Sequence, residues 1–361
     1  MGTILNKDIR LSNVKGLLIF LIVFGHIIEI YKSDYKDLYV FIYAFHMPLF
    51  IFVSGYLSKR VNISKMINLI LVYLTFQTFF NWYRNYLGKE LTSPFLYEIP
   101  QFHLWYIVSL VFWYAVALLI SKLELKSLGK WIVLIVIFGV GFISRWYAND
   151  LVGFASRYYT DFSTYTFSYQ RTLSFASFYF AGFFLTKKRL NKLYHLIKST
   201  GIKVCITLLS FLLIFLYIQE NPVMEHIFRG SYGTDMFLGA EKDINNYLIL
   251  VSLHYIIAGW ICLMILNFIS ERTSIITKWG DHSLTIFLFH PVFVFLIGKY
   301  NITENWNLEV QLLFLFSINV AICYVLGSNL FVKVTRYICN PYKSIKNTLP
   351  KHEVERSGHQ T

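Results

Sequence analysis

The stretch "NVKGLLIFLIVFGHIIE", residues 13–29, is long and apolar enough to cross a membrane as a helix, yet it carries three ionisable side chains. Lys15 lies near its start, and His26 and Glu29 lie near its end. Ionisable groups are costly in hydrocarbon, and where they occur they commonly have a function. Both the fold and the function therefore depend on why these residues share one helix.

The rest of the chain has the composition of an integral membrane protein. Of its 361 residues, 56% are hydrophobic and 15% are charged, which is more apolar surface than a soluble domain needs. The apolar runs are continuous rather than alternating, so they predict helices rather than strands. We expect an all-α polytopic membrane protein with about ten transmembrane helices. The expected spans are residues 14–30, 39–57, 66–87, 103–121, 130–147, 172–186, 203–218, 246–268, 284–299 and 309–332.

Ten spans place both termini on one side of the membrane, and the charged residues indicate which side. The segments on the side of the termini hold 23 of the 33 Lys and Arg, whereas the opposite side holds 14 of the 20 Asp and Glu. This is the positive-inside pattern, so we expect both termini in the cytoplasm of a multi-pass cell-membrane protein, a bacterial plasma membrane being the expected setting. The net charge of +13 then faces membrane lipids and anionic molecules at the inner surface, and we expect no nucleic-acid partner.

The sequence predicts one large domain and a tail. Residues 1–340 form the expected integral-membrane domain, without an internal repeat, and residues 341–361 form a polar cytoplasmic tail that we expect to be disordered. Two longer segments are expected outside the membrane. Residues 148–171 are rich in Tyr and Phe, and residues 219–246 carry five acidic residues against Arg229 and Lys242.

Lys15, His26 and Glu29 share one helical face. Lys15 and His26 are eleven residues apart, close to three turns, or roughly 16 Å along the axis. Glu29 follows His26 by three positions and is within reach of its imidazole. These residues are either a functional group or, alternatively, a snorkelling lysine and a histidine bonded to a neighbouring helix.

Other histidines are expected at related depths. His46 and His254 match the depth of His26, His103 lies at the outer start of the fourth span, and His290 lies deeper on the ninth. Several histidines in the outer leaflet suggest a polar chamber, although each could also be a satisfied core histidine. The sequence has no His-x-x-x-His or His-Glu pair at ligand spacing, so we expect no metal.

The third span carries a polar stripe. Gln77, Asn81 and Arg84 follow one another at i, i+4 and i+7. They could line the same chamber or form an interhelical hydrogen-bond seam, and the sequence does not separate the two. In the second span, Ser54 and Gly55 predict a close approach of two helices rather than a nucleophile, because no GxSxG motif surrounds them.

Five blocks of sequence resemble acyltransferase family 3, the multi-pass membrane O-acyltransferases, and within it the fucose 4-O-acetylase-like branch. The blocks are "KGLLIFLIVFGH" (15–26), "FHMPLFIFVSGYL" (45–57), "HLWYIVSLVFWY" (103–114), "RTLSFASFYFAGFFL" (171–185) and "WGDHSLTIFLFHPV" (279–292). Each block alone is unspecific, but all five occur in the family order. Two positions depart from the family pattern: Ser12 stands where many members have Asp, and Lys15 stands where many have Arg.

The resemblance implies an O-acyltransferase that moves an acyl group, usually acetyl from acetyl-CoA, to a hydroxyl of an extracytoplasmic glycan. The donor nucleotide would meet Lys15, Lys59 and Arg60 at the basic inner face. His26 would act as general base or as the site of an acyl-histidine, and Glu29 would orient its ring.

The remaining site residues follow from the same resemblance and from the expected chamber. His46 or Asn81 would stabilise the oxyanion. His103, Trp105, Asn81, Arg84 and Arg171 would bind the acceptor, a glycan or a lipid-linked saccharide. A transporter or flippase, and a non-catalytic subunit of polysaccharide assembly, are the alternative functions. The sequence leaves open the acceptor, the acyl group and the oligomeric state, a homo-oligomer included.

Overall fold

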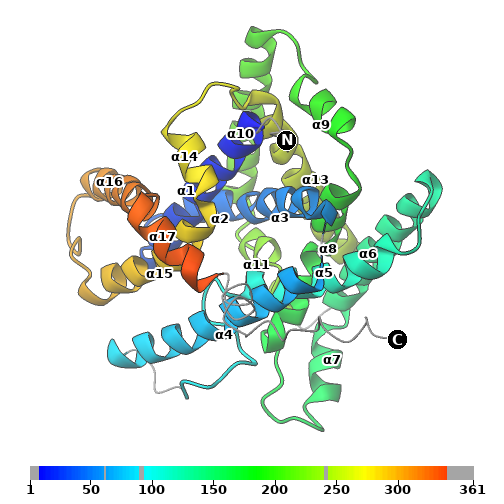
Figure 1. Cartoon of the computed structure of the whole chain (residues 1–361), viewed down its shortest axis with the longest axis horizontal. Coiled ribbons are helices and arrows are strands. Elements are labelled where there is room, and N and C mark those ends of the chain that lie inside the picture. Colours follow the sequence, from blue (N-terminus) through cyan, green and yellow to red (C-terminus); the bar gives the residue numbers. More distant parts are fainter. Residues whose placement is uncertain (1–7, 61, 89–92, 240–242, 340–361) are drawn as a thin grey trace, which may run out of the picture.

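The computed structural model describes residues 8–60, 62–88, 93–239 and 243–339, and the regular elements in these ranges are helical (Figure 1). The first half contains α1 (Ile9–Ile30), α2 (Lys36–Tyr43), α3 (His46–Leu57), η1 (Ser58–Arg60), α4 (Ile63–Tyr86), α5 (Trp105–Ser121), α6 (Ser127–Trp146), α7 (Ala148–Ala155), η2 (Thr166–Ser168) and α8 (Tyr169–Phe184). The second half contains α9 (Lys187–Tyr194), α10 (Thr200–Glu220), α11 (Met224–Arg229), α12 (Asp235–Leu238), α13 (Ile244–Phe268), α14 (Ile275–Asp281), α15 (Ser283–Tyr300), α16 (Leu308–Leu326) and α17 (Asn329–Ile338).

The all-helical fold is confirmed, whereas the number of spans is not. By length and composition, eight helical segments of the described chain could cross a membrane: α1, α2 with α3, α4, α6, α10, α13, α15 and α16. The expected fourth span is the shorter apolar helix α5, and the expected sixth is α8, which has 16 residues. The count of ten and the side of the termini stay predictions, and the tail from residue 341 lies outside the described residues.

The expected second span is broken into α2 and α3. Pro48 lacks an N–H and so cannot donate to the carbonyl of Ala44, four residues earlier. Helix α2 ends at Tyr43, and α3 begins at His46 with Pro48 in its first turn, where a missing donor is tolerated. The break leaves Tyr43 and His46 on two separate helix ends beside α1.

Helix α3 packs along α8 through glycines. A Cβ placed on Gly55 would lie 1.9 Å from the carbonyl oxygen of Tyr179, and one on Gly182 would lie 1.9 Å from that of Phe52. Such distances exclude any side chain, so the two backbones touch at this crossing. The prediction that Gly55 permits close helix approach is therefore confirmed.

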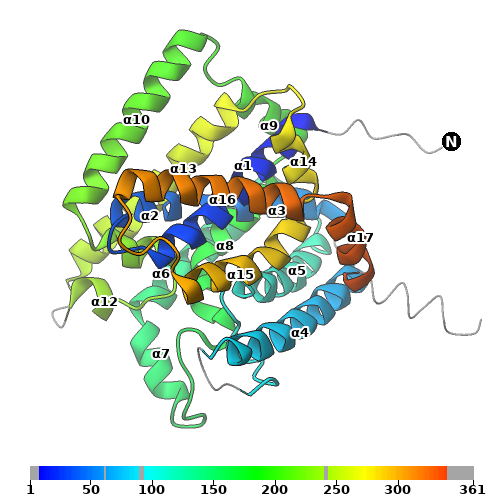
Figure 2. The same cartoon turned by 90° about the vertical axis from the view of Figure 1, so that its left-hand side faces the viewer.

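Helix α1 occupies the middle of the bundle. Figure 1 shows α1 and α3 near the centre, with α15 and α16 on one side and α6 on the other, and Figure 2 shows α10 at the outer edge. At its start, α1 packs on α14, and the Ser12 hydroxyl donates to Oδ1 of Asp281 at 2.9 Å. Ser12, where the family pattern has Asp, thus serves the packing of the first helix.

Candidate active site

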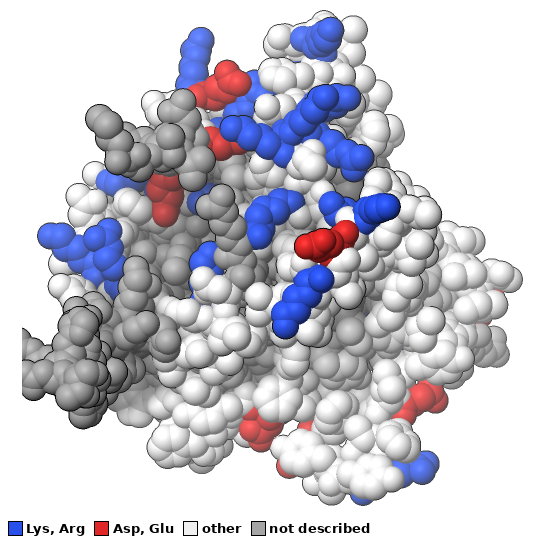
Figure 3. All heavy atoms as spheres, turned by 45° about the vertical axis from the view of Figure 1, so that its right-hand side comes forward, with Lys and Arg blue, Asp and Glu red and all other residues white. Residues whose placement is uncertain are grey.

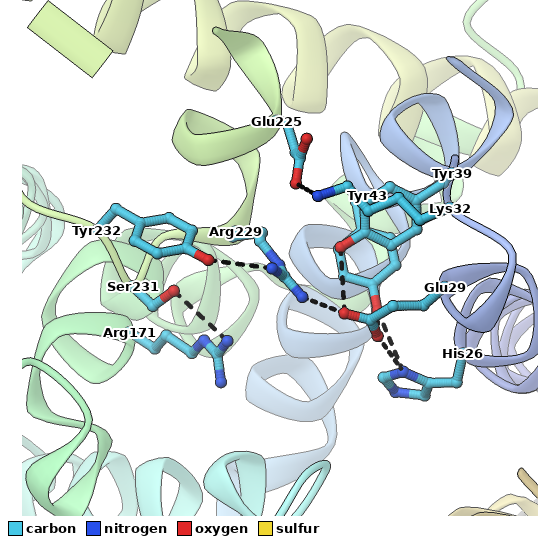
Figure 4. A network of polar contacts seen from close by, with 10 residues as sticks. All are labelled: His26, Glu29, Lys32, Tyr39, Tyr43, Arg171, Glu225, Arg229, Ser231 and Tyr232. Carbon is cyan, nitrogen blue, oxygen red and sulfur yellow. Dashed lines mark hydrogen bonds and ion pairs between the residues drawn. The ribbon is translucent and has the colours of Figure 1, made fainter. Parts of the chain in front are cut away.

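His26 and Glu29 form a hydrogen-bonded pair at the end of α1. Nδ1 of His26 lies 3.3 Å from Oε2 of Glu29, as their i, i+3 spacing predicts. The Tyr43 hydroxyl donates to the same carboxylate oxygen at 2.9 Å and lies 3.1 Å from Nδ1, while the Tyr39 hydroxyl reaches Oε1 at 3.4 Å (Figure 4). The carboxylate is therefore fixed from several sides, and it favours the His26 tautomer with a proton on Nδ1.

Arg229 completes this pair from a distant part of the chain. Its guanidinium forms an ion pair with Oε1 of Glu29, and Nη1 donates to the Tyr232 hydroxyl at 3.1 Å. Burial opposes the charged form, but Glu29 and the neighbouring tyrosines together outweigh it and raise the pKa of Arg229 above its ordinary value. The guanidinium therefore stays charged at any working pH. Sequence reasoning missed Arg229, whose only signal was a basic residue in a largely acidic outer segment.

Helix α11 is held in place by contacts at both ends. Glu225 forms an ion pair with Lys32 next to α1. The fully buried Arg145 at the end of α6 donates from Nη2 to the carbonyl of Ile227 at 2.9 Å. These contacts fix the short helix that carries Arg229, because six residues are too few to form a stable helix alone.

A pocket of about 220 Å³ opens in front of the pair. Its polar lining comes from five separate helices and brings together two histidines, one carboxylate and two arginines. Aromatic and apolar side chains close the rest. The lining residues are His26, Glu29, Tyr43, His46, Met47, Pro100, Phe102, Trp105, Tyr165, Arg171, Phe175, Phe228 and Arg229.

The polar stripe of α4 holds a loop against the bundle. Nε2 of Gln77 donates to the Leu96 carbonyl at 2.9 Å, and Nδ2 of Asn81 donates to the same oxygen at 3.0 Å. Arg84 donates to the Gln101 side chain. Neither Asn81 nor Arg84 is among the residues that line the pocket. The stripe is thus a hydrogen-bond seam, but it joins α4 to a loop rather than to another helix as the second interpretation expected.

The loop held by this seam presents Phe102 to the catalytic candidate. Phe102 has a φ of 45°, in the left-handed region that is strained for a bulky residue. Its ring centroid lies 4.3 Å from that of His26. The strained backbone therefore places an aromatic wall directly against the imidazole.

Three of the other four histidines converge on this region. His46 lines the pocket, and its Nδ1 lies 2.7 Å from the Ile42 carbonyl, so its neutral form carries the proton there. The ring of His290 stacks on that of His26 at 5.5 Å, and the ring of His103 lies 5.2 Å beyond it.

His103 is not exposed to the pocket. It is buried behind His290, and neither of its ring nitrogens has a hydrogen-bond partner in the part of the chain that the structure describes. His254 lies elsewhere, with Nδ1 3.5 Å from Arg145. Among the described residues, no group of three His, Cys, Asp or Glu side chains could hold a metal ion.

Trp105 and Arg171 lie together in the pocket wall. The guanidinium carbon of Arg171 is 5.0 Å from the centroid of the Trp105 ring. Of the residues predicted for the site, the structure therefore brings together His26, Glu29, His46, Trp105 and Arg171.

The sequence of this helical bundle matches a known family along most of its length. The family model of the acyltransferase 3 group, described as an acyltransferase domain, matches residues 8–328. The chain belongs to the acyltransferase 3 family. All five blocks quoted above lie within the match.

Similarity to curated members is local. The chain is 44% identical over 60 residues to nodulation protein NolL of Sinorhizobium fredii (strain NBRC 101917 / NGR234), which covers 15% of this chain and 16% of that protein. It is 38% identical over 66 residues to nodulation protein NolL of Mesorhizobium japonicum (strain LMG 29417 / CECT 9101 / MAFF 303099), a match that covers 17% of this chain and 18% of that protein. The chain thus spans about a sixth of the length of these relatives. No solved structure matches it.

This acyltransferase 3 chain has a second, basic hollow at the opposite ends of α1, α3 and α8. The hollow measures about 920 Å³, and its charged lining consists of Lys59, Lys130 and Lys187 together with Asp8 and Glu124, an excess of one positive charge. Figure 3 shows Lys and Arg gathered over the upper part of one face of the molecule. Lys15 is half-buried on α1 and is not among the residues that line the hollow, and the side chain of Arg60 lies outside the described residues.

Lys59 also contacts the end of α8. Its ammonium donates to the carbonyls of Phe183 and Leu185, the latter at 2.6 Å, where the helix dipole favours a cation. Burial, and to a lesser extent Lys130, lower the pKa of Lys59 to about 8. Its charge is therefore sensitive to pH just above neutrality.

Proposed function

We propose that this protein transfers an acyl group, usually acetyl, from acyl-CoA at the inner membrane face to a hydroxyl of an extracytoplasmic or cell-surface glycan. The single observation that carries the proposal is the His26–Glu29 pair, which faces a pocket in a chain of the acyltransferase 3 family. The fucose 4-O-acetylase-like branch and a cell-membrane location belong to the same proposal.

In this mechanism His26 is the general base. Nδ1–H of His26 donates a hydrogen bond to Glu29, so Nε2 carries the lone pair. Nε2 then takes the proton from the acceptor hydroxyl. The hydroxyl oxygen attacks the thioester carbonyl, and the C–S bond breaks as the tetrahedral intermediate collapses. The proton held by His26 then passes to the departing thiolate. An acyl-histidine formed on Nε2 would use the same tautomer.

His46 is the better placed of the two proposed oxyanion donors. It lines the pocket, whereas the Asn81 amide is bonded to loop carbonyls outside it. Because Nδ1 of His46 faces the Ile42 carbonyl, its Nε2 donates only when the ring is doubly protonated. Burial of the His46 ring favours its neutral form, so His46 would stabilise the oxyanion only if the reaction itself protonated it.

The donor would approach from the basic hollow. Helices α1, α3 and α8 each run from this hollow to the pocket, and the twelve residues of α3 span about 18 Å. The two spaces share no lining residue. Between them, the Tyr106 ring packs on Phe50 and its hydroxyl bonds to Ser54 at 2.5 Å. The thioester arm must therefore part these side chains to reach His26.

Replacement of His26 tests the proposal. Purified His26→Ala protein should transfer no acetyl from labelled acetyl-CoA to glycan, while it elutes from a sizing column like the unaltered protein. His195→Ala, at an exposed histidine outside the pocket, is the matched control and should retain transfer. Near-normal acetylation by His26→Ala would refute the mechanism. Absence of transfer by the unaltered protein would favour a transporter, a flippase or a non-catalytic subunit.

A further inference from the structure

The pocket in front of His26 contains a surplus positive charge. Glu29 is the only carboxylate among its described lining residues, and Arg229 already neutralises it. Arg171 brings a second guanidinium into the same lining. Figure 4 shows both arginines projecting toward Glu29 and His26 from the opposite wall.

The groups that contact Arg171 directly are neutral, while Arg229 and Glu29 act on its charge from farther away. Its Nη2 lies 3.5 Å from the hydroxyl oxygen of Ser231, a long contact. Its guanidinium carbon lies 5.0 Å from the Trp105 ring centroid and 5.7 Å from that of Tyr165. In the part of the chain that the structure describes, no carboxylate forms an ion pair with it.

A cation in a largely enclosed pocket is costly unless it is paired. The two aromatic faces compensate only part of this cost. An anionic ligand would supply the missing charge, and the guanidinium fork matches the planar geometry of a carboxylate or the oxygens of a phosphate.

We propose that the acceptor is an acidic sugar, whose carboxylate or phosphate group binds Arg171 while a hydroxyl of the same unit reaches His26. The inference rests on the proposed acyl transfer and adds the class of acceptor. The donor does not account for Arg171, because the phosphates of a coenzyme A would lie in the basic hollow at the other end of α8.

The construction of the pocket agrees with an acceptor from the outer side. Tyr165 and Arg229 belong to the two segments expected outside the membrane, and both line the pocket. A volume of about 220 Å³ is below the roughly 300 Å³ at which pockets for drug-sized ligands begin. We therefore expect one sugar unit to enter, with aromatic rings around it.

Matched acceptors test the inference. The assay measures kcat/KM for acetyl transfer to a hexuronate-containing oligosaccharide, to the same oligosaccharide after carboxyl reduction, and to its 6-phosphorylated counterpart. We expect an acidic acceptor to be preferred over the neutral one by about 10–100-fold, the range for hydrogen bonds to a charged group. The acidic acceptor that shows this advantage identifies the anionic group.

Variants of Arg171 then assign the preference. Arg171→Gln should lose the advantage of the acidic acceptor, so that its kcat/KM for the acidic and the neutral acceptor becomes similar. Arg171→Lys should keep part of the advantage, because it keeps the charge but not the fork. Arg157→Gln, at an exposed arginine of the same outer segment, is the control and should behave like the unaltered protein.

Two results would overturn the inference. One is equal kcat/KM of the unaltered protein for acidic and neutral acceptors. The other is an equal loss on both acceptors in a normally folded Arg171→Gln protein, which would assign Arg171 to the acyl-transfer chemistry. Failure of the proposed function is distinct from both, because no acceptor of any charge would then gain a His26-dependent ester.

Discussion

Removal of the Arg229 charge should show how far α11 controls the chemistry at His26. The side chains of Arg229 and Glu29 are 20% and 22% exposed, so their ion pair lies between the buried and the surface case. Breaking a buried pair costs about 3–5 kcal/mol, and a surface pair contributes about 0–1 kcal/mol. Glu29 keeps its contacts with Tyr43 and His26. We therefore expect a cost of about 2 kcal/mol, or about 30-fold in kcat/KM.

A double-mutant cycle on acetyl-transfer rates measures this coupling. Arg229→Gln should lower kcat/KM by about 30-fold, because the carboxylate, held then only by tyrosine hydroxyls and by His26, orients His26 Nδ1 less firmly. Glu29→Gln should lower it by about 100–1,000-fold, within the range for losing general-base catalysis. The double variant should match Glu29→Gln alone, since Arg229 acts through Glu29.

Additive losses would refute this reasoning. If the double variant falls by the product of the two single losses, Arg229 acts independently of Glu29, and the ion pair has no role in orienting the base. Arg157→Gln is again the control for a change of charge on the outer side. Thermal unfolding of each variant separates a lost catalytic geometry from a lost fold.

Three further predictions follow from local geometry. Gly55→Ala should destabilise the protein by at least about 1–3 kcal/mol, because the new Cβ would lie 1.9 Å from a backbone oxygen. In the control Gly139→Ala, the new Cβ meets no atom within 4 Å, and the thermal midpoint should rise slightly. Equal thermal midpoints of the two variants would contradict the close helix crossing. Because Lys59 loses its proton as pH rises through about 8, the KM for acetyl-CoA should rise above that pH, and Lys59→Arg should abolish the rise; an unchanged pH profile in that variant would remove Lys59 from donor binding. Phe102→Ala should lower kcat about tenfold, because it removes the aromatic ring that packs against His26, and losing such a ring contact raises the activation free energy by about 1 kcal/mol. Full activity of this variant would show that the ring is dispensable.

The long helices and the first-helix pair could be predicted because local rules decide them. Continuous apolar runs require helices in a membrane, and the i, i+3 spacing brings Glu29 to His26 whatever surrounds them. The break before His46 was missed, because the prediction followed the continuous apolar run and not Pro48, which interrupts helical hydrogen bonding. Apolar length alone did not show where α2 ends.

Other parts of the site depend on contacts between distant segments. Arg229 reaches Glu29 because Glu225 and Ile227 anchor a six-residue helix, and no periodic pattern marks that arrangement. The α4 stripe was equally compatible with a chamber and with a seam. The side chains of the stripe bond to carbonyls of the loop around Leu96. The sequence does not indicate where a loop will fold back, so it could not predict these partners.

The packed layer of Phe50, Ser54 and Tyr106 between the two hollows has a consequence for the membrane itself. A water-filled duct through the helical bundle would let protons and salts run down their gradients, whereas packed side chains between the two hollows, which share no lining residue, oppose such a leak. Under the proposed function, we expect these side chains to separate only as far as the width of a pantetheine chain requires. A branched or otherwise bulky acyl group would not fit through such a passage. We therefore expect the enzyme to select donors by the width of their acyl group before the transfer step.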